Sequence, residues 1–172
     1  MRDYRSMTRA PLTETEAIPP AARYVAPTRS AALMNRSIRR LVRMGISVWG
    51  ARDLRLRGRK SGEIRSTVVN VLDLEGERFL VAPRGTTEWV KNLRAAGEGE
   101  LRVGRRVEPF TAGELTDVEK LPVLRAYLTR WKWEVGQFFQ GVGPDAPDAD
   151  LIAIAPGYPI FRLTDRSGAE AA

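Results

Sequence analysis

Between residues 54 and 115 the chain alternates short strand-like segments with glycine-containing turns, and this pattern limits its fold more than any other feature. The apolar and β-branched residues in each segment, and the turns between them, predict antiparallel hairpins. The predicted strands are residues 54–57, 66–74, 78–82, 101–103 and 107–115. Short antiparallel strands that surround one helix are closed most economically as a small barrel.

That single helix is predicted between the two hairpins. Residues 88–96 can form a short helix, which Thr87 begins as an N-cap residue and Gly97 ends. The start of such a helix carries free N–H groups and the positive end of the helix dipole, so it attracts anions. We therefore expect this helix to contribute to ligand binding as well as to the core.

The late part of the chain predicts one longer helix and a last strand. Residues 116–119 (Thr-Asp-Val-Glu) have the spacing of a capping box, and the helix continues through Trp131. Pro122 either kinks the start of this helix or marks its true first turn. Residues 141–147 are predicted to form a loop, and the apolar residues 158–163 are short enough for a strand.

The composition excludes several classes of chemistry. The 172 residues include no histidine and no cysteine, so disulfides, zinc fingers, cysteine or histidine nucleophiles and imidazole metal sites are absent. We expect no metal, and any reaction must depend on a cofactor or on the remaining polar side chains. The polar N-terminus and the lack of any run of about 20 apolar residues predict a cytoplasmic protein.

The basic character of the chain calls for an anionic partner. Its net charge is +7, and arginines concentrate between residues 29 and 65. Nucleic acid, an anionic membrane face and an acidic small molecule could each match this charge. Residues 28–49 predict a basic amphipathic helix, which either packs on the domain with a solvated arginine face or lies on lipid. In the second case the protein would associate with the inner face of the membrane.

The expected organisation is one domain with two peripheral segments. Residues 1–27 lack a hydrophobic period and are predicted to form a mobile arm. Residues 28–165 form the single domain, including the basic helix, and residues 166–172 a disordered tail.

The turn at residues 58–62 (Gly-Arg-Lys-Ser-Gly) is the strongest candidate for a binding site. Arg59, Lys60 and the nearby Arg65 can give charge-assisted hydrogen bonds to a phosphate or a carboxylate, and Ser61 adds a hydroxyl. The glycines leave backbone N–H groups accessible. The spacing matches neither a Walker A loop nor a dinucleotide-binding fingerprint. An ordinary turn with solvated basic residues is the alternative.

A second group of candidate residues lies around the short helix. Arg84 and Gly85 come just before its N-terminus, where anions are favoured. Trp89 and Asn92 are three residues apart and share one face of the helix. Trp89 offers a flat apolar wall for a ring system, and Asn92 offers a donor and an acceptor. In the alternative, Trp89 and Leu93 are simply the core-facing residues of the helix.

These residues together resemble the deazaflavin-dependent nitroreductase family, mainly over residues 33–115. The resemblance rests on the turn at 58–62 followed by Arg65, on residues 81–85 (Val-Ala-Pro-Arg-Gly), and on Trp89 and Asn92. It implies an α+β fold, an antiparallel, FMN-binding-like split β-barrel with peripheral helices. It also implies an oxidoreductase that binds the deazaflavin coenzyme F420 and transfers a hydride to an organic acceptor such as a quinone, an unsaturated carbonyl or a nitroaromatic.

The resemblance also implies roles for individual residues. The expected cofactor-binding residues are Arg59, Lys60, Ser61, Gly62, Arg65, Arg84, Gly85, Trp89 and Asn92. The cofactor carries the chemistry, so no catalytic side chain is assigned. The aromatic run at residues 131–139 differs from the tyrosines of nitroimidazole-reducing relatives, so nitro-reduction is not implied. Most of that run is expected in the core, with Trp133 and Phe138 as the candidate substrate-binding residues.

Other functions remain open at this level. A split barrel can bind FMN, whose single phosphate would suit the same turn. A non-enzymatic protein that binds a membrane surface or nucleic acid would also be basic, and a carrier could hold the cofactor without turning it over. Because the basic residues of the central region gather in one turn, we expect no nucleic-acid partner. The expected state is a monomer or a homodimer.

Overall fold

The computed structural model of the chain describes residues 23–25 and 51–166. The predicted basic helix at 28–49 lies outside the described residues, as do most of the predicted arm and the tail from residue 167. Within residues 1–27, the described segment Arg23–Val25 lies against the domain, because Tyr24 forms an antiparallel bridge with Gly85.

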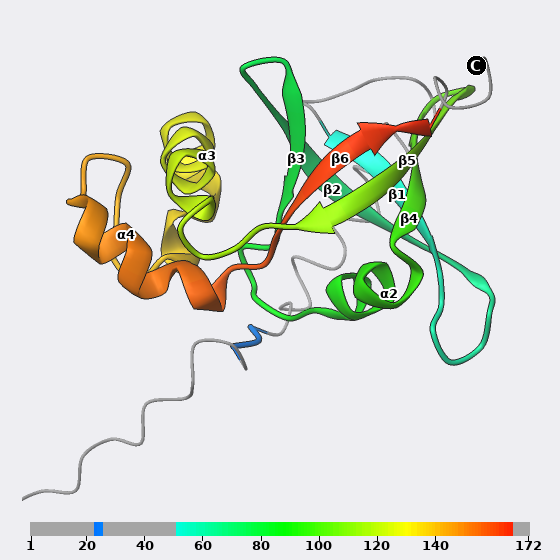
Figure 1. The fold of residues 1–172 in the computed structure, drawn as a ribbon, viewed down its shortest axis with the longest axis horizontal. Coiled ribbons are helices and arrows are strands. Elements are labelled where there is room, and N and C mark those ends of the chain that lie inside the picture. Colours follow the sequence, from blue (N-terminus) through cyan, green and yellow to red (C-terminus); the bar gives the residue numbers. More distant parts are fainter. Residues whose placement is uncertain (1–22, 26–50, 167–172) are drawn as a thin grey trace, which may run out of the picture.

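Six antiparallel strands close into a barrel, which confirms the predicted α+β split-barrel class (Figure 1). The strands are β1 Ala51–Arg57, β2 Ile64–Leu74, β3 Glu77–Val81, β4 Glu98–Val103, β5 Arg106–Glu114 and β6 Ile160–Asp165. Around the barrel they follow the order β1-β2-β3-β6-β5-β4. The barrel closes where Leu54 of β1 faces Leu101 of β4, and β6 lies between β3 and β5.

Three α-helices surround the barrel in the described part of the chain. They are α2 Glu88–Ala96, α3 Lys120–Val135 and α4 Asp148–Ile154, and 3-10 turns follow at Gly136–Phe138 and Ala155–Gly157. In Figure 1, α2 lies below the barrel, whereas α3 and α4 flank it on the left. The sequence did not predict α4. No helix among the described residues is both long and apolar enough to span a membrane.

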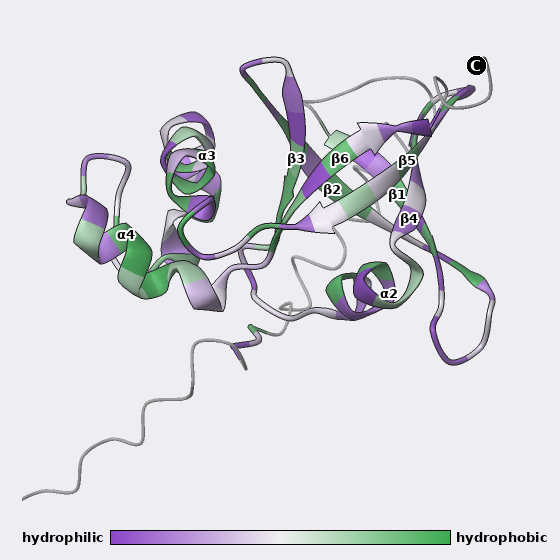
Figure 2. Ribbon diagram, viewed as in Figure 1, coloured by the Kyte–Doolittle hydropathy of each residue, from purple (hydrophilic) through white to green (hydrophobic). Residues whose placement is uncertain are grey.

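The apolar residues form two clusters, one inside the barrel and one between its wall and α3. The inner cluster comprises Leu54, Leu56, Val69, Val71, Leu80, Ala82, Val90, Leu93, Leu101, Phe110, Phe161 and Leu163. Strand β3 serves both clusters, because Leu80 points into the barrel while Phe79 and Val81 pack with α3. This explains why β3 is apolar on both faces. In Figure 2 the barrel strands mix hydrophobic and hydrophilic stretches, and the β1–β2 turn is mostly hydrophilic.

The helix starts differ from the predictions in detail. Thr87 occupies the N-cap position of α2, but its hydroxyl makes no capping hydrogen bond. The Glu119 carboxylate accepts hydrogen bonds from the N–H and the hydroxyl of Thr116, at 2.8 and 2.7 Å, as in a capping box. Regular helix α3 begins only at Lys120, however, and Pro122 lies in its first turn. The backbone of α3 is kinked at Trp131.

Candidate functional site

The turn between β1 and β2 presents its basic side chains to solvent. The N–H of Gly58 donates to the carbonyl of Glu63, and the N–H of Gly62 donates to the carbonyl of Gly58, both at 2.8 Å. Gly62 adopts a φ of 70°, which favours glycine. Arg59 and Lys60 are exposed on this turn, and Lys60 forms no ion pair within the described residues. The turn is thus a closed backbone loop near which Arg65 pairs with Glu63 at 2.9 Å, while Lys60 stays unpaired among the described residues.

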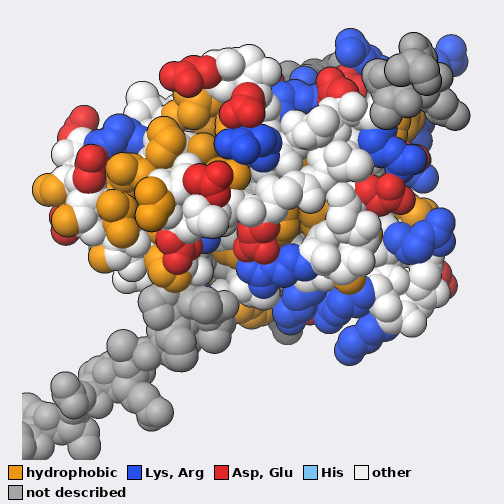
Figure 3. All heavy atoms as spheres, viewed as in Figure 1, with side chains coloured by type: hydrophobic (Ala, Val, Ile, Leu, Met, Phe, Trp, Pro, Cys, Tyr) orange, Lys and Arg blue, Asp and Glu red, His pale blue; other side chains and the backbone are white. Residues whose placement is uncertain are grey.

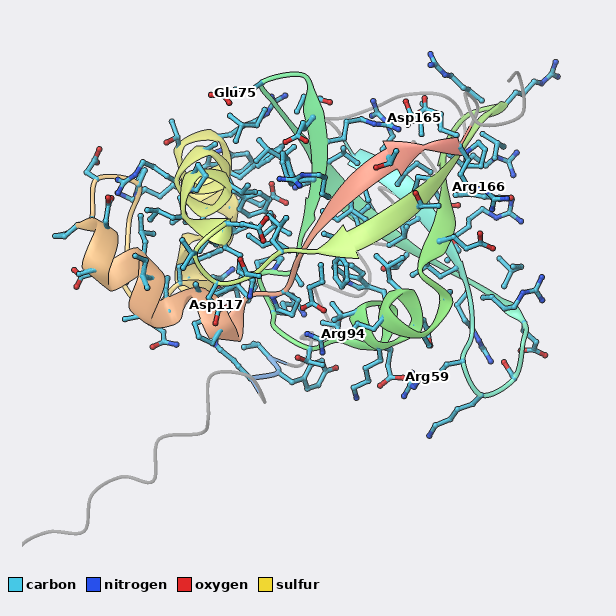
Figure 4. All side chains as sticks on the ribbon, in the orientation of Figure 1. Arg59, Glu75, Arg94, Asp117, Asp165 and Arg166 are labelled. Carbon is cyan, nitrogen blue, oxygen red and sulfur yellow. The ribbon has the colours of Figure 1, made fainter. Side chains whose placement is uncertain are left out.

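Helix α2 holds this turn in place through Asn92. The buried Asn92 side-chain oxygen accepts hydrogen bonds from the backbone N–H of Arg59 at 3.2 Å and from its guanidinium at 3.0 Å. Arg59 also pairs with Glu88 at 2.9 Å. Figure 4 shows Arg59 beside α2 at the lower right. The structure therefore gives Asn92 a specific task, which is to fix the basic turn against the helix.

Glu88 is an acidic residue at the edge of this basic turn. Hydrogen bonds from Arg59, and next from Lys91, lower the pKa of Glu88 to about 2. The carboxylate is therefore ionised at any ordinary pH, and it neutralises part of the positive charge of Arg59. An anionic ligand bound in the turn would compete with Glu88 for Arg59.

Before the N-terminus of α2, the segment Arg23–Val25 is bound to the connection that follows β3. The N–H of Val25 donates to the carbonyl of Arg84 at 2.9 Å, and the N–H of Thr86 donates to the carbonyl of Arg23 at 2.8 Å. The Arg84 guanidinium lies 5.0 Å from the centre of the Phe138 ring. These contacts join the N-terminal segment, the β3–α2 connection and the end of α3.

One groove of about 980 Å³ runs from the basic turn to the region where the β3–α2 connection meets the end of α3. Its floor includes consecutive residues of β2 from Arg65 to Asn70, with the basic turn and α2 at one end. Residues from the end of α3 and from the β3–α2 connection line the other end. This size is within the range of pockets that enclose a small molecule or a cofactor.

The groove brings together most of the residues that the sequence analysis singled out. Its lining includes the predicted residues Arg59, Lys60, Ser61, Arg65, Arg84, Trp89, Asn92, Trp133 and Phe138. Gly62 and Gly85 do not line it: Gly62 shapes the basic turn, and Gly85 pairs with Tyr24. Trp89 also packs against Phe161, with ring centres 6.0 Å apart, so it is both a groove residue and a neighbour of the inner core.

The aromatic run near the end of α3 divides between the core and the groove. Trp131 and Phe139 are buried in the outer cluster. Trp133 is 68% exposed and lines the groove with the half-buried Phe138. The alternation follows the helical period, which turns residues two apart to different sides.

Sequence reasoning missed several polar residues in the groove. They include Asn70, Thr87 (taken only as a cap), Glu88, Tyr127 and Glu134. Asn70 carried a signal, since it is the one amide in the apolar run of β2. Glu134 carried little signal in the sequence, because its position in the groove depends on how α3 packs on the barrel. The Thr87 hydroxyl is buried and has no hydrogen-bond partner among the described residues.

Positive charge gathers at one end of the groove. In Figure 3, Lys and Arg side chains cluster along the lower right, where Figure 1 places α2 and the β1–β2 turn. The described cations that line the groove there are Arg59, Lys60 and Arg65. The other end is mainly aromatic and, among the described residues, carries the guanidinium of Arg84 and the carboxyl group of Glu134. A matching ligand has an anionic tail and a flat, largely apolar body.

Comparison with known proteins gives a family match. The family model described as F420H(2)-dependent quinone reductase matches residues 36–137. No curated protein matches the chain.

Solved structures resemble the chain at low sequence identity. A structure described as a domain-swapped dimer is 16% identical, with a TM-score of 0.51, and the match covers 80% of this chain and all of that one. An F420-H2 dependent reductase, FDR-A, is 18% identical with a TM-score of 0.49, over 67% of this chain and 94% of that one. A NimC/NimA family protein from Clostridium acetobutylicum is 12% identical with a TM-score of 0.45, over 80% and 88%. The match to the domain-swapped dimer, with its TM-score of 0.51, supports the fold.

Proposed function

We propose, since the chain belongs to the F420H(2)-dependent quinone reductase family, that the groove binds coenzyme F420 and an organic acceptor side by side. The resemblance to deazaflavin-dependent reductases drawn from the sequence is confirmed, and coenzyme F420 is the cofactor of this family. The roles of individual residues and the choice of acceptor belong to the proposal.

The arrangement of charge in the groove carries this proposal. Coenzyme F420 has a phosphate and a polyglutamate tail, and Arg59, Lys60 and Arg65 offer three cations at one end. The unpartnered hydroxyl of Thr87, at the start of α2 in the described part of the chain, can donate a further hydrogen bond. The donor set therefore fits an anionic cofactor.

The rest of the groove suits the ring system and the acceptor. Trp89 lines the wall near α2, and β2 provides a continuous backbone edge toward α3. Trp133 and Phe138 then form an aromatic wall for a flat acceptor, for which we propose a quinone. When bound in its reduced form, the cofactor supplies a hydride. The protein orients the two partners and excludes water from their contact.

The proposal is tested by titrating the protein with coenzyme F420 and with FMN while following tryptophan fluorescence. We expect preference for F420, and a loss of affinity of about ten- to hundredfold in Lys60→Ala and Arg65→Ala, since each change removes a charge-assisted hydrogen bond. Arg105→Ala removes an equal charge from the distant β4–β5 turn and controls for net charge. Preference for FMN would change the cofactor, and binding of neither would overturn the proposal.

Replacing Glu88 with glutamine should strengthen cofactor binding severalfold. The substitution removes the negative charge that pairs with Arg59 and Lys91, so both cations become available to an anionic ligand. The gain should shrink as salt is added, because the residues are exposed and screened. The affinity at low and high ionic strength measures this effect. Weaker binding in Glu88→Gln would show instead that Glu88 orients Arg59 for the ligand.

A further inference from the structure

Among the described residues that line the groove, Glu134 is the one acidic side chain at the aromatic end. It lies in the last turn of α3, beyond the kink at Trp131, and it lines the groove together with Tyr127 of the same helix. Its carboxyl group forms a hydrogen bond with the side chain of Asn70 on β2. Asn70 is five residues beyond Arg65, which places it about 17 Å along the strand from the basic turn.

The surroundings of Glu134 favour its protonated form. Burial raises the pKa of its carboxyl group, and the hydrogen bond with Asn70 offsets this only in part. Burial also raises the pKa of the neighbouring Tyr127 hydroxyl, and the charge of Glu134 adds to that effect.

The charged groups around Glu134 do not neutralise it. Arg84, which also lines the groove, packs over Phe138, and Arg130 packs over Trp131 on the same helix. Lys132 lies beside the loop at Gly143. No salt bridge to Glu134 occurs in the part of the chain that the structure describes. The group is therefore a half-buried acid in a groove, without a paired cation among those residues.

We propose that Glu134 is the proton donor to the hydride acceptor, an inference that rests on the proposed function. Reduction of a quinone to a quinol needs one hydride and one proton. As a C–H bond of the reduced deazaflavin breaks, its electron pair and hydrogen pass to the quinone. The O–H bond of Glu134 breaks, and its proton forms a new O–H bond on the quinone oxygen. The carboxylate then regains a proton, either from solvent or from the cofactor, whose ring nitrogen loses its proton once the hydride has left.

The position of Glu134 and the chemistry of its carboxyl group distinguish a role as proton donor from a role in packing. An acid that only joined α3 to β2 would need its hydrogen bond to Asn70 and no ionisable proton. A proton donor needs a carboxyl group that faces the groove beside the acceptor site and holds its proton at working pH. Glu134 lies between Trp133 and Val135, both of which also line the groove.

The test compares Glu134→Gln with wild type and with Glu75→Gln, which changes an exposed glutamate at the β2–β3 turn (Figure 4). Glutamine keeps the size of the side chain and a hydrogen bond to Asn70 but has no acidic proton. We expect F420 affinity within about twofold of wild type in both variants. Quinone reduction should fall about 10²- to 10⁴-fold in Glu134→Gln only.

The pH profile and a measurement without cofactor complete the test. The wild-type rate should fall as pH rises through the raised pKa of Glu134, and this fall should be absent in Glu134→Gln and partly restored in Glu134→Asp. In the cofactor-free protein, carbon NMR of labelled glutamates should show one carboxyl that titrates above the usual range and disappears in Glu134→Gln. Wild-type protein that binds no F420 would overturn the proposed function and this inference with it. Normal binding with unchanged turnover in Glu134→Gln would overturn this inference alone.

Discussion

Replacing Gly85 with alanine is expected to destabilise the domain by about 2–4 kcal/mol and to release the segment Arg23–Val25. An added Cβ would lie 1.9 Å from the carbonyl oxygen of Arg23, and Gly85 has a φ of 79°, where a side chain is strained. The two hydrogen bonds that join Val25 and Arg23 to this connection would be lost with the displacement. Urea denaturation measures the change.

The loss should extend to the groove, because this segment supports its aromatic end. Tyr24 and Val25 line the groove, and Arg23 lies 4.6 Å over the Tyr158 ring and donates a hydrogen bond to the carbonyl of Phe138. We therefore expect faster hydrogen exchange at the Thr86 amide and weaker acceptor binding in Gly85→Ala.

Gly97→Ala is the matched control for this prediction. Gly97 has a φ of 68°, but an added Cβ would meet nothing within 4 Å. Its cost is then the backbone strain alone, about 1 kcal/mol. Equal destabilisation by the two substitutions would contradict a specific contact between Gly85 and Arg23.

Local elements were predictable from the sequence because local interactions determine them. Helix α2 spans the predicted residues 88–96, and Gly97 ends it with a φ of 68° and a bond from its N–H to Leu93. The two hairpins pair as predicted, since each closes over a short turn. Helix α4 was missed because its seven residues offer too few positions for a periodic pattern.

The closure of the barrel was predictable as a class of fold, whereas the strand partners that close it were not. Strand β6 pairs with β3 and β5, and Phe79 of β3 faces Arg162, which is 83 residues later. Neither strand contains a turn signal or spacing that specifies a partner so distant in sequence.

The candidate site likewise has one part that the sequence predicted and one part that it did not. The basic turn is contiguous in sequence, so its residues were identified, and their role remains a prediction. The opposite end of the groove combines Asn70, Tyr127 and Glu134, which come from two elements. Only the packing of α3 on the barrel brings them together, and nothing in their sequence spacing indicated it.

The buried Trp131 takes part in the packing of α3 on the barrel. Trp131→Ala is expected to lower the free energy of unfolding by about 3–5 kcal/mol. The side chain is 1% exposed at the kink of α3, and its ring centre lies 4.9 Å from that of Tyr127. Alanine would leave a cavity between the helix and the barrel wall. For a domain of this size the melting temperature should fall by roughly 10 °C, which calorimetry measures.

Trp133→Ala provides the control, because it removes the same side chain two residues later on the exposed side. With 68% of Trp133 exposed, its loss should change the unfolding free energy by about 0.5 kcal/mol or less. Its effect should appear instead in the affinity for a quinone, since Trp133 lines the groove. Similar destabilisation by both substitutions would contradict the division of this aromatic run between core and groove. A stable Trp131→Ala protein would show that other contacts hold α3, and with it Glu134, in place.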